Sequence, residues 1–354
     1  MKIVIDAMAA EFGGIRTYVD QLVAAWQRSF PGDELHVMVP RGSSIAAAAL
    51  NRHQIAVRRP AVAGRPWAQS RTMYRAIGEL DADAVLATMP STTFRRLRSP
   101  VAVVVHDLRH QLRPDQFSRA RRVIRWVAYG RAYAVADGFV AVSARTRDDL
   151  HEMQPSTRGR PVVVVHHGAD HVLEWPPPDR SGPAVAFAHH TNKNAQLMID
   201  AWAVLSAQGS SDRLLIVGVG SDRRRLQAEI DERGLADCVS LAPFLPEDEF
   251  RRVVAAAAMI VFPSDFEGFG LPVVEGMALG KPVVIGPDRA TIEVAGGHAA
   301  VMEDWTASAL AAAVDQARRM TDIDLAEALA WGRSFTWERT AHETRAALAA
   351  LSGR

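Results

Sequence analysis

The sequence predicts an α/β protein built from two doubly wound parallel sheets, one in each half of the chain. Its 354 residues are too many for one ordinary domain and suit two. Short apolar runs alternate with helical patterns in both halves, as in parallel sheets covered by helices. Between the halves, Trp175–Pro183 contains three consecutive prolines and then a fourth, which neither a helix nor a central strand accommodates. We therefore expect domains over residues 1–175 and 184–334.

The apolar runs mark the expected strands. In the first half these are Ile3–Ile5, Leu35–Val39, Ala84–Ala87, Val101–Val105, Phe139–Val142 and Val162–Val165. In the second half they are Ala184–Ala188, Leu214–Val217, Met259–Phe262 and Pro282–Ile285. Ligands of such sheets bind beyond the carboxyl ends of the strands, and two facing domains create a cleft there. We therefore expect functional side chains directly after the strands.

Composition narrows the class of protein. The chain is 48% hydrophobic and 23% charged, and it lacks an apolar run approaching the roughly 18 residues of a membrane span. The N-terminus enters a strand pattern at once, so we expect no signal peptide and a cytoplasmic setting. The single cysteine, Cys238, excludes an intrachain disulfide and a cysteine-cluster metal site.

Charge is distributed unevenly. Residues 1–180 carry 25 Lys and Arg against 17 Asp and Glu, whereas residues 181–354 carry 16 against 23. A basic half can attract anionic lipid, phosphate or nucleic acid. The helical pattern over Arg119–Arg131 mixes arginines with aromatic and aliphatic residues. Such a helix could lie on an anionic membrane surface, or it could be a buried domain helix with a solvated arginine face. A second basic stretch, Arg52–Arg75, favours the membrane-facing interpretation, and we expect no nucleic-acid partner.

The most informative segment is Phe262–Glu275, which places two carboxylates eight residues apart, at Glu267 and Glu275. Between them lie a glycine-rich turn and Pro272, which is suited to the first turn of a helix. A strand that breaks into such a turn and restarts as a helix directs backbone N–H groups toward the strand's exit. This pattern is typical of a site for a polyhydroxylated, anionic ligand.

The same segment resembles the Glu-x7-Glu signature of family 4 glycosyltransferases, which are retaining enzymes that use nucleotide sugars. The resemblance continues through Gly276–Gly286 and covers the chain from Met1 to about Ala341. It implies the GT-B fold, in which two Rossmann-like domains face a central cleft. It also implies that a C-terminal helix, residues 335–354, packs back on the N-terminal, acceptor-binding domain.

The resemblance assigns roles to residues of the signature. It implies that Glu267 is catalytic and holds the hydroxyls of the donor sugar, and that Glu275 binds the ribose. It further implies that the remaining donor-binding residues of the segment contact the sugar and phosphate oxygens; these are Phe266, Gly268, Phe269, Gly270 and Leu271.

Three further positions follow strands. Gly13 and Gly14 open an amphipathic helix after the first strand, where a plain tight turn and a phosphate contact are both compatible with the sequence. His106 follows Val101–Val105, and an isolated His-Asp pair is usually structural. The resemblance implies that the two glycines contact the donor diphosphate or the acceptor. It implies that His106 contacts the transferred sugar.

Lys193 stands at a helix N-terminus, an unfavourable position for a cation unless an anion binds there. The resemblance implies that this lysine binds the donor diphosphate. The family usually has an arginine just upstream, and this chain has His190 in its place. We therefore expect weaker or pH-dependent neutralisation of the phosphates, or the use of another arginine such as Arg16.

Other motifs in the sequence give weaker indications of function. Asp81 and Asp83 imitate a metal-binding Asp-x-Asp motif but precede their strand, and adjacent histidines on a strand point to opposite faces, so we expect no metal and no other cofactor. Gly218-Val-Gly220 lacks the third glycine of a dinucleotide fingerprint, which disfavours an NAD-type oxidoreductase. The other interpretation of Gly218-Val-Gly220 is a tight turn between a strand and a helix.

With these features, the family resemblance implies a retaining glycosyltransferase that moves a sugar from a nucleotide-diphosphate sugar to a hydroxyl of a glycan or a lipid-linked acceptor. We expect GDP-mannose as the donor. The alternatives are a UDP- or dTDP-sugar transferase acting on a small molecule, and, in another class, the oxidoreductase. We expect a cytoplasmic protein on the inner face of a membrane.

Overall fold

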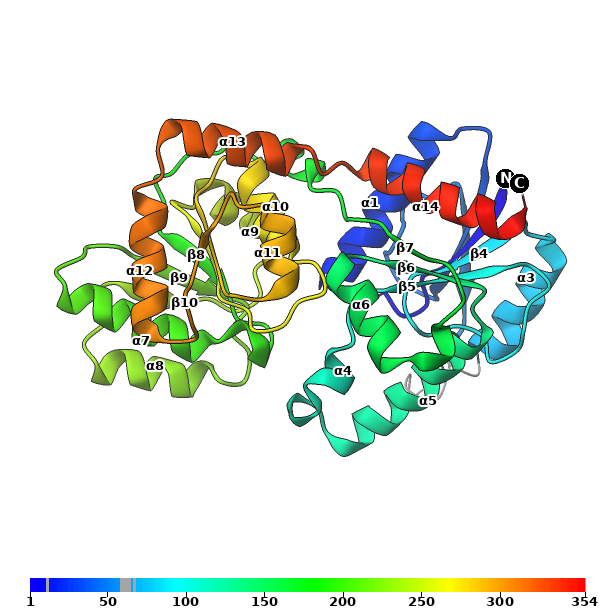
Figure 1. Cartoon of the computed structure of the whole chain (residues 1–354), viewed down its shortest axis with the longest axis horizontal. Helices are drawn as coiled ribbons and strands as arrows, with labels where there is room; N and C mark the ends of the chain where they lie inside the picture. The colour runs from blue at the N-terminus through cyan, green and yellow to red at the C-terminus, as the bar shows by residue number, and fades with distance from the viewer. Residues whose placement is uncertain (11–12, 58–64, 66–67, 354) are drawn as a thin grey trace. The chain divides into compact units, whose positions relative to one another are not determined.

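A computed structural model describes residues 1–10, 13–57, 65 and 68–353. The chain divides into two compact units (Figure 1). Unit 1 comprises Met1–Gly168 with Thr336–Arg354, and unit 2 comprises Ala169–Phe335. Each unit contains one sheet whose strand pairs are all parallel. The predicted fold class, α/β with two doubly wound sheets, is confirmed.

The sheet of unit 1 has seven strands in the order β3-β2-β1-β4-β5-β6-β7. Their bounds are β1 Lys2–Asp6, β2 Glu34–Pro40, β3 Asn51–Ile55, β4 Ala84–Ala87, β5 Val101–Val105, β6 Gly138–Ala141 and β7 Val162–Val164. Strand β3 has the sequence Asn-Arg-His-Gln-Ile and was not predicted. It lies at the edge of the sheet, where a strand needs no apolar run because one side remains open.

The helices of unit 1 surround this sheet (Figure 1). Their bounds are α1 Gly13–Ser29, η1 Gln69–Met73, α3 Tyr74–Leu80, α4 Arg109–Leu112, η2 Pro114–Gln116, α5 Arg119–Val135, α6 Ala144–Met153, η3 Pro155–Thr157 and α14 Trp337–Ser352. Helix α14 packs against α1, and Thr336 caps its N-terminus by accepting a hydrogen bond from the Arg339 amide. Gly168 lets the segment after β7 pass close to the start of α14, because a Cβ there would lie 2.3 Å from the Trp337 nitrogen.

The sheet of unit 2 has six strands in the order β10-β9-β8-β11-β12-β13. Their bounds are β8 Ala184–Phe187, β9 Leu214–Val217, β10 Val239–Leu241, β11 Ile260–Phe262, β12 Val283–Ile285 and β13 Ala300–Val301. The helices are η4 Asp170–Glu174, η5 Thr191–Lys193, α7 Ala195–Ala207, α8 Arg223–Glu232, α9 Glu247–Ala256, α10 Leu271–Ala278, α11 Arg289–Ala295, α12 Ala307–Arg318 and α13 Asp322–Arg333. The two strands that were not predicted, β10 and β13, are again the edges.

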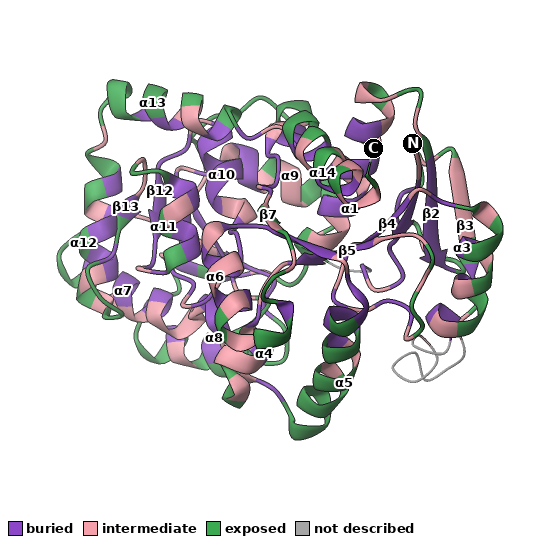
Figure 2. Cartoon of the chain, turned by 45° about the vertical axis from the view of Figure 1, so that its right-hand side comes forward, coloured by how far each residue is buried: buried purple, intermediate pink, exposed green. Residues whose placement is uncertain are grey.

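Both sheets are buried between helices whose outer faces are exposed (Figure 2). In unit 2, the fully buried Trp202 of α7 and Val314 of α12 belong to the same core as Ile216 and Val261 of the sheet. The proline-containing segment Trp175–Pro183 lies within this unit. There the buried Lys281 donates hydrogen bonds to the carbonyl oxygens of Asp179 and Ala255, which fastens the segment to α9.

The strand order fixes where each sheet can receive a ligand. In unit 2 the chain runs outward from β8 to β9 and β10 on one side, and the remaining strands, from β11 on, lie on the other. Strand β1 has the same position in unit 1, between β2 and β4. The connections after strands at such a topological switch point leave in opposite directions and create a crevice at the carboxyl edge.

Candidate functional site

Two loops meet at the switch point of unit 2, the one after β8 and the one after β11. Asn194 ends η5 in the left-handed conformation, with φ 55°, and its side chain donates a hydrogen bond to the Pro263 carbonyl oxygen at 2.9 Å. The Asp265 amide donates to the Asn192 carbonyl oxygen, also at 2.9 Å. These bonds hold the loop that carries Lys193 against the loop that carries Glu267.

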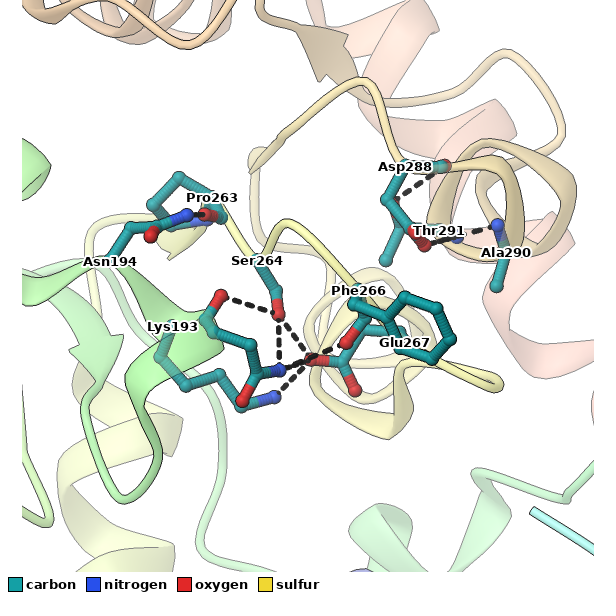
Figure 3. Close-up of polar contacts among 10 residues, drawn as sticks. Lys193, Asn194, Pro263, Ser264, Phe266, Glu267, Asp288, Ala290 and Thr291 are labelled. Carbon is teal, nitrogen blue, oxygen red and sulfur yellow. Dashed lines mark hydrogen bonds and ion pairs between the residues drawn. The ribbon is translucent and has the colours of Figure 1, made fainter. Parts of the chain in front are cut away.

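Glu267 is the centre of the resulting cluster (Figure 3). Its Oε1 lies 2.5 Å from Lys193 Nζ and 2.9 Å from Asn192 Nδ2, and it also accepts from the Ser264 hydroxyl. Lys193 Nζ lies 4.1 Å from the centre of the Phe262 ring, a cation–π contact that helps to hold the amine. The carboxylate is therefore fixed by a buried lysine, an amide and a hydroxyl, and the ion pair as a whole is neutral.

Helix α10 starts at the same edge. Gly270 is its N-cap and has φ 104°, a conformation open to glycine, and Pro272 lies in the first turn, as predicted. Gly276 allows the helix to pack closely on the sheet, because a Cβ at this position would lie 2.8 Å from Ile260 Cγ1. The partially positive N-terminus of α10 is thereby held beside the Glu267 loop.

Glu275 has a different partner from Glu267. It is buried on α10, and its Oε1 lies 3.2 Å from Nε2 of the buried His171 on η4. The ring of His171 in turn meets Trp175 edge-on, with centroids 5.7 Å apart. The two carboxylates of the signature are thus held by separate groups.

The other predicted residues of unit 2 differ in exposure. Phe266 and Phe269 are buried; the Phe266 carbonyl oxygen accepts from Asn192 Nδ2, and the Phe269 ring meets Phe335 edge-on at 6.0 Å. Gly268 is buried and Leu271 is half-buried. His190 is exposed, and its ring lies 4.8 Å from that of His189.

The remaining predicted residues belong to unit 1. Gly13 and Gly14 are exposed and begin α1, and Gly13 has φ 61°; the preceding Phe12 lies outside the described residues. His106 is half-buried, and its Nε2 lies 2.9 Å from the Thr88 carbonyl oxygen. Burial lowers the pKa of His106, against the opposing influence of that bond and of Asp107. Its neutral form is favoured, which suits a hydrogen-bonding group rather than a cation.

The structure adds functional candidates that the sequence analysis missed. In unit 2 these are Asn192, Ser264 and His171, whose contacts with the two glutamates join segments far apart in the chain. In unit 1, Asp6 ends the switch-point strand β1, is 2% exposed, and accepts from the Met8 amide at 3.1 Å and from Gln69 Nε2 at 3.1 Å. Burial raises the pKa of Asp6 to about 6. Its place directly after the first strand was a signal available in the sequence.

In the part of the chain that the structure describes, no group of three or more His, Cys, Asp or Glu side chains is arranged to hold a metal ion. No helix there is long and apolar enough to cross a membrane.

Comparison with known families agrees with this architecture. Residues 12–173 match the profile described as Glycosyltransferase Family 4, and residues 186–329 match Glycosyl transferases group 1. Each unit of the chain therefore carries one match to a glycosyltransferase profile, and neither profile covers half of the chain.

Curated relatives are similar over part of their length. The chain is 32% identical to D-inositol 3-phosphate glycosyltransferase of Nocardia farcinica over 59% of this chain and 51% of that protein. It is 31% identical to O-antigen chain mannosyltransferase B of Escherichia coli over 33% and 32%, respectively. It is 34% identical to 2-deoxystreptamine glucosyltransferase of Streptomyces kanamyceticus over 30% and 28%. The chain therefore spans about half or less of these relatives.

Solved structures share the fold over nearly the whole chain. Anabaena HepE, solved in complex with UDP and glucose, superposes with a TM-score of 0.76 over 99% of this chain and 100% of its own, at 17% identity. WaaG, a glycosyltransferase involved in lipopolysaccharide biosynthesis, superposes with a TM-score of 0.69 over 99% and 100%, at 15% identity. At these identities the likeness establishes the fold.

Proposed function

We propose that the protein is a retaining family 4 glycosyltransferase that moves a sugar from a nucleotide-diphosphate sugar to a hydroxyl group of a glycan or a lipid-linked acceptor. The observation that carries this proposal is the Lys193–Glu267 cluster at the switch point of unit 2. It combines a cation, a fixed carboxylate and a helix N-terminus at one sheet edge, as a sugar diphosphate requires. The resemblance of Phe262–Glu275 to the family signature supports it.

In this proposal, different residues of unit 2 bind different parts of the donor. Glu267 accepts hydrogen bonds from hydroxyls of the donor sugar, and Glu275, held by His171, accepts them from the ribose. Lys193 and the N-terminus of α10 offset the charge that develops on the departing diphosphate. Gly268–Leu271 provide backbone amides for the sugar and phosphate oxygens.

For unit 1 we retain the roles that the family resemblance implies. Gly13 and Gly14 begin α1 and are assigned to the diphosphate or the acceptor. His106 is assigned to the transferred sugar, as a hydrogen-bonding and positioning group. Because a retaining transferase delivers the acceptor to the face that the leaving group vacates, His106 is not needed as a base on the opposite face.

We propose that the reaction needs no metal ion, because a lysine and a helix N-terminus are available to stabilise the leaving group. Addition of EDTA should then leave turnover unchanged. Loss of turnover in EDTA that added Mg²⁺ or Mn²⁺ restores would contradict this part of the proposal.

GDP-mannose remains our proposed donor, and the similarity to an O-antigen chain mannosyltransferase supports it. A UDP-sugar is the second candidate, because HepE was solved with UDP and glucose and with UDP-glucose. With a UDP- or dTDP-sugar, a small-molecule acceptor would fit the similarity to 2-deoxystreptamine glucosyltransferase.

A thermal-shift panel tests the donor class directly. GDP-mannose, UDP-glucose, an ADP-sugar and a dTDP-sugar are compared with NAD at equal concentration. We expect one nucleotide sugar to raise the melting temperature more than the others and NAD to have no effect, since a ligand that binds only the folded state stabilises it. Stabilisation by NAD alone would contradict the proposal and favour an oxidoreductase.

We further propose that the protein associates with the inner face of a membrane through α5. Four neighbouring apolar side chains of this helix are exposed: Val123 by 61%, Ile124 by 43%, Trp126 by 71% and Val127 by 47%. Exposed arginines at 119, 121 and 122 precede and adjoin them, and most of the helix surface is open to solvent (Figure 2). An apolar patch with interfacial tryptophan and adjacent arginines suits an anionic bilayer surface. The basic stretch Arg52–Arg75 lies in part outside the described residues.

A further inference from the structure

The edge of unit 2 that would receive an anionic donor is itself acidic. We define this carboxyl edge as the residues from the end of each strand to the first residue of the next α-helix, namely 188–195, 218–223, 242–247, 263–271, 286–289 and 302–307. It contains seven carboxylates, which are Asp222, Glu247, Asp265, Glu267, Asp288, Glu303 and Asp304. It contains three Lys or Arg residues, which are Lys193, Arg223 and Arg289. A diphosphate would therefore meet an excess of negative charge.

Lys193, the cation nearest the switch point, shares its charge with a carboxylate. Lys193 Nζ forms an ion pair with Glu267 Oε1 at 2.5 Å, so the pair contributes no net charge. Arg223 and Arg289 begin the flanking helices α8 and α11, and each follows an aspartate in the chain. The N-terminus of α10 supplies only a partial positive charge. Lys193 and this N-terminus therefore offset only part of the charge of a diphosphate, and a further cation would strengthen its binding.

His189 and His190 lie at this edge, on the loop that carries Lys193. They follow the switch-point strand β8 after one residue, Ala188, and both are exposed, with ring centroids 4.8 Å apart. The Lys193 amide donates to the His190 carbonyl oxygen at 3.1 Å, so His190 begins the turn that delivers Lys193 to Glu267. A Cβ at Gly218 would lie 3.4 Å from the Cβ of His189, and the exposed Phe244 ring lies 6.4 Å from the His189 ring.

We propose that His189 and His190 supply the missing charge, and that the pair takes up a proton when the diphosphate of a nucleotide sugar binds. This inference rests on the proposed function and deepens it. Imidazole ordinarily titrates close to neutral pH, and an anion held nearby favours its protonated form. Because two adjacent imidazolium rings repel each other, the pair should take up about one proton rather than two.

Several charged groups lie on the segments next to the two histidines. Lys193 lies on the same loop, Asp265 and Glu267 on the loop after β11, Asp222 and Arg223 at the start of α8, and Glu247 at the start of α9. The experiment leaves all of them unchanged, so that a difference between variants reports on the two histidines alone.

Isothermal titration calorimetry at pH 6, 7 and 8 tests the proposal, with UDP-glucose and GDP-mannose as probes. The diphosphate of a nucleotide sugar is a diester and does not titrate in this range, unlike that of free UDP. Heats measured at each pH in two buffers of different ionisation enthalpy give the number of protons taken up. We expect uptake approaching one proton, with an affinity that falls by up to about tenfold for each pH unit above the titration.

Variants assign the proton to the pair. His189→Asn with His190→Asn should bind weakly at all three pH values and take up no proton. His189→Asn with His190→Arg should bind at pH 8 as tightly as at pH 6, because arginine stays charged. Both positions are exposed, so neither double variant should change the melting temperature of the free protein by more than a few degrees.

The outcomes separate this inference from the proposed function. If a nucleotide sugar binds the wild type without proton uptake, or if the asparagine variant still takes up a proton, the inference is wrong and the proposed function stands. If neither probe nor any other nucleotide sugar of the thermal-shift panel binds between pH 6 and pH 8, both are wrong.

Discussion

Glu267 owes its position to donors from two loops that are far apart in the chain. Lys193 and Asn192 come from the exit of β8, and Ser264 comes from the exit of β11. Replacing the carboxylate with an amide keeps the size of the side chain but removes its charge. Charge-assisted hydrogen bonds contribute about 1.5–3 kcal/mol each, so the loss of one from the transition state corresponds to about 10–100-fold in rate.

We therefore expect Glu267→Gln to lower kcat for sugar transfer by about 100-fold while the far-ultraviolet circular dichroism stays that of the wild type. The matched control is Glu303→Gln, because Glu303 is an exposed carboxylate at the exit of another strand, β13. Steady-state kinetics of both variants provide the measurement. Wild-type turnover in Glu267→Gln would remove this residue from the catalytic site.

Asp6 predicts a pH dependence of stability. Burial raises its pKa from 3.8 to about 6, so between these values the folded state binds more protons than the unfolded state. The contribution of Asp6 to the stability of the folded state is therefore fully present below about pH 4, and it is lost as the pH rises through about 6. The difference between the two pKa values corresponds to about 3 kcal/mol.

Asp6→Asn should abolish that dependence, since asparagine can still accept from the Met8 amide and carries no charge. We expect the melting temperature of the variant, relative to the wild type, to rise between pH 4.5 and pH 7.5. Parallel thermal melts across this range provide the test. A constant difference between the two proteins would show that Asp6 does not titrate there.

A functional residue could be predicted from the sequence when it belongs to a short motif of neighbouring residues. It could not be predicted when its role depends on contacts between distant segments. Glu267, Glu275 and Lys193 stand in short motifs, and their position at strand exits followed from the apolar runs. The pairing of Glu275 with His171 could not be predicted, because it depends on how η4 packs against α10. Asn192 and Ser264 have ordinary polar side chains, and only the meeting of the two loops gives them a role.

At the scale of elements, the start of α10 is set by one glycine. Gly270 has φ 104°, and a Cβ there would lie 3.2 Å from Thr291 Cγ2 on α11. An alanine in this left-handed region costs about 1–2 kcal/mol, and relieving the strain would move the first turn of α10. We expect Gly270→Ala to lower donor affinity at least tenfold, as measured by calorimetry with the preferred nucleotide sugar.

Gly280→Ala is the matched control for backbone strain. Gly280 also has a positive φ, 69°, but it follows the other end of α10, and a Cβ there would meet only Leu329 Cδ1, at 3.9 Å. It should reduce the melting temperature by a similar amount and leave donor affinity unchanged. Equal effects of both substitutions on affinity would argue against a specific role for the start of α10.

Helix α5 gives a prediction about surfaces. Trp126→Ala should reduce co-sedimentation with vesicles that contain anionic phosphatidylglycerol by several-fold, and neither protein should bind vesicles of phosphatidylcholine alone. Ile323→Ala on α13 is the control, because Ile323 is 72% exposed, much as Trp126 is at 71%. Equal binding of wild type and Trp126→Ala would exclude this helix as the membrane contact.

Strands were predictable where they form an apolar run, which holds for the buried central strands and also for the edge strand β7. The three that were not predicted, β3, β10 and β13, lie at sheet edges, and two of them have only two or three residues. An edge strand needs fewer apolar residues and pairs on one side, so its sequence carries little periodic signal. The helix α10, in contrast, was indicated by Pro272 and the glycines before it.

At the scale of the whole molecule, the two sheets followed from length, apolar rhythm and the proline-containing segment. The strand orders did not, since they depend on which strands pair across the chain. Charge also has meaning at this scale. The excess of acidic residues in the second half coincides with the unit that carries Lys193 and Glu267, which is why neutralisation of a bound diphosphate becomes a question for particular side chains.

The central claim is that this chain activates a nucleotide-diphosphate sugar, and release of the nucleoside diphosphate tests it most directly. The wild type and Glu267→Gln are incubated with GDP-mannose, UDP-glucose and the other sugars of the panel, and the GDP, UDP or other diphosphate formed is quantified by chromatography. We predict release from one donor by the wild type, about 100-fold slower in the variant. Absence of release from every donor, or equal release by the two proteins, would contradict the account.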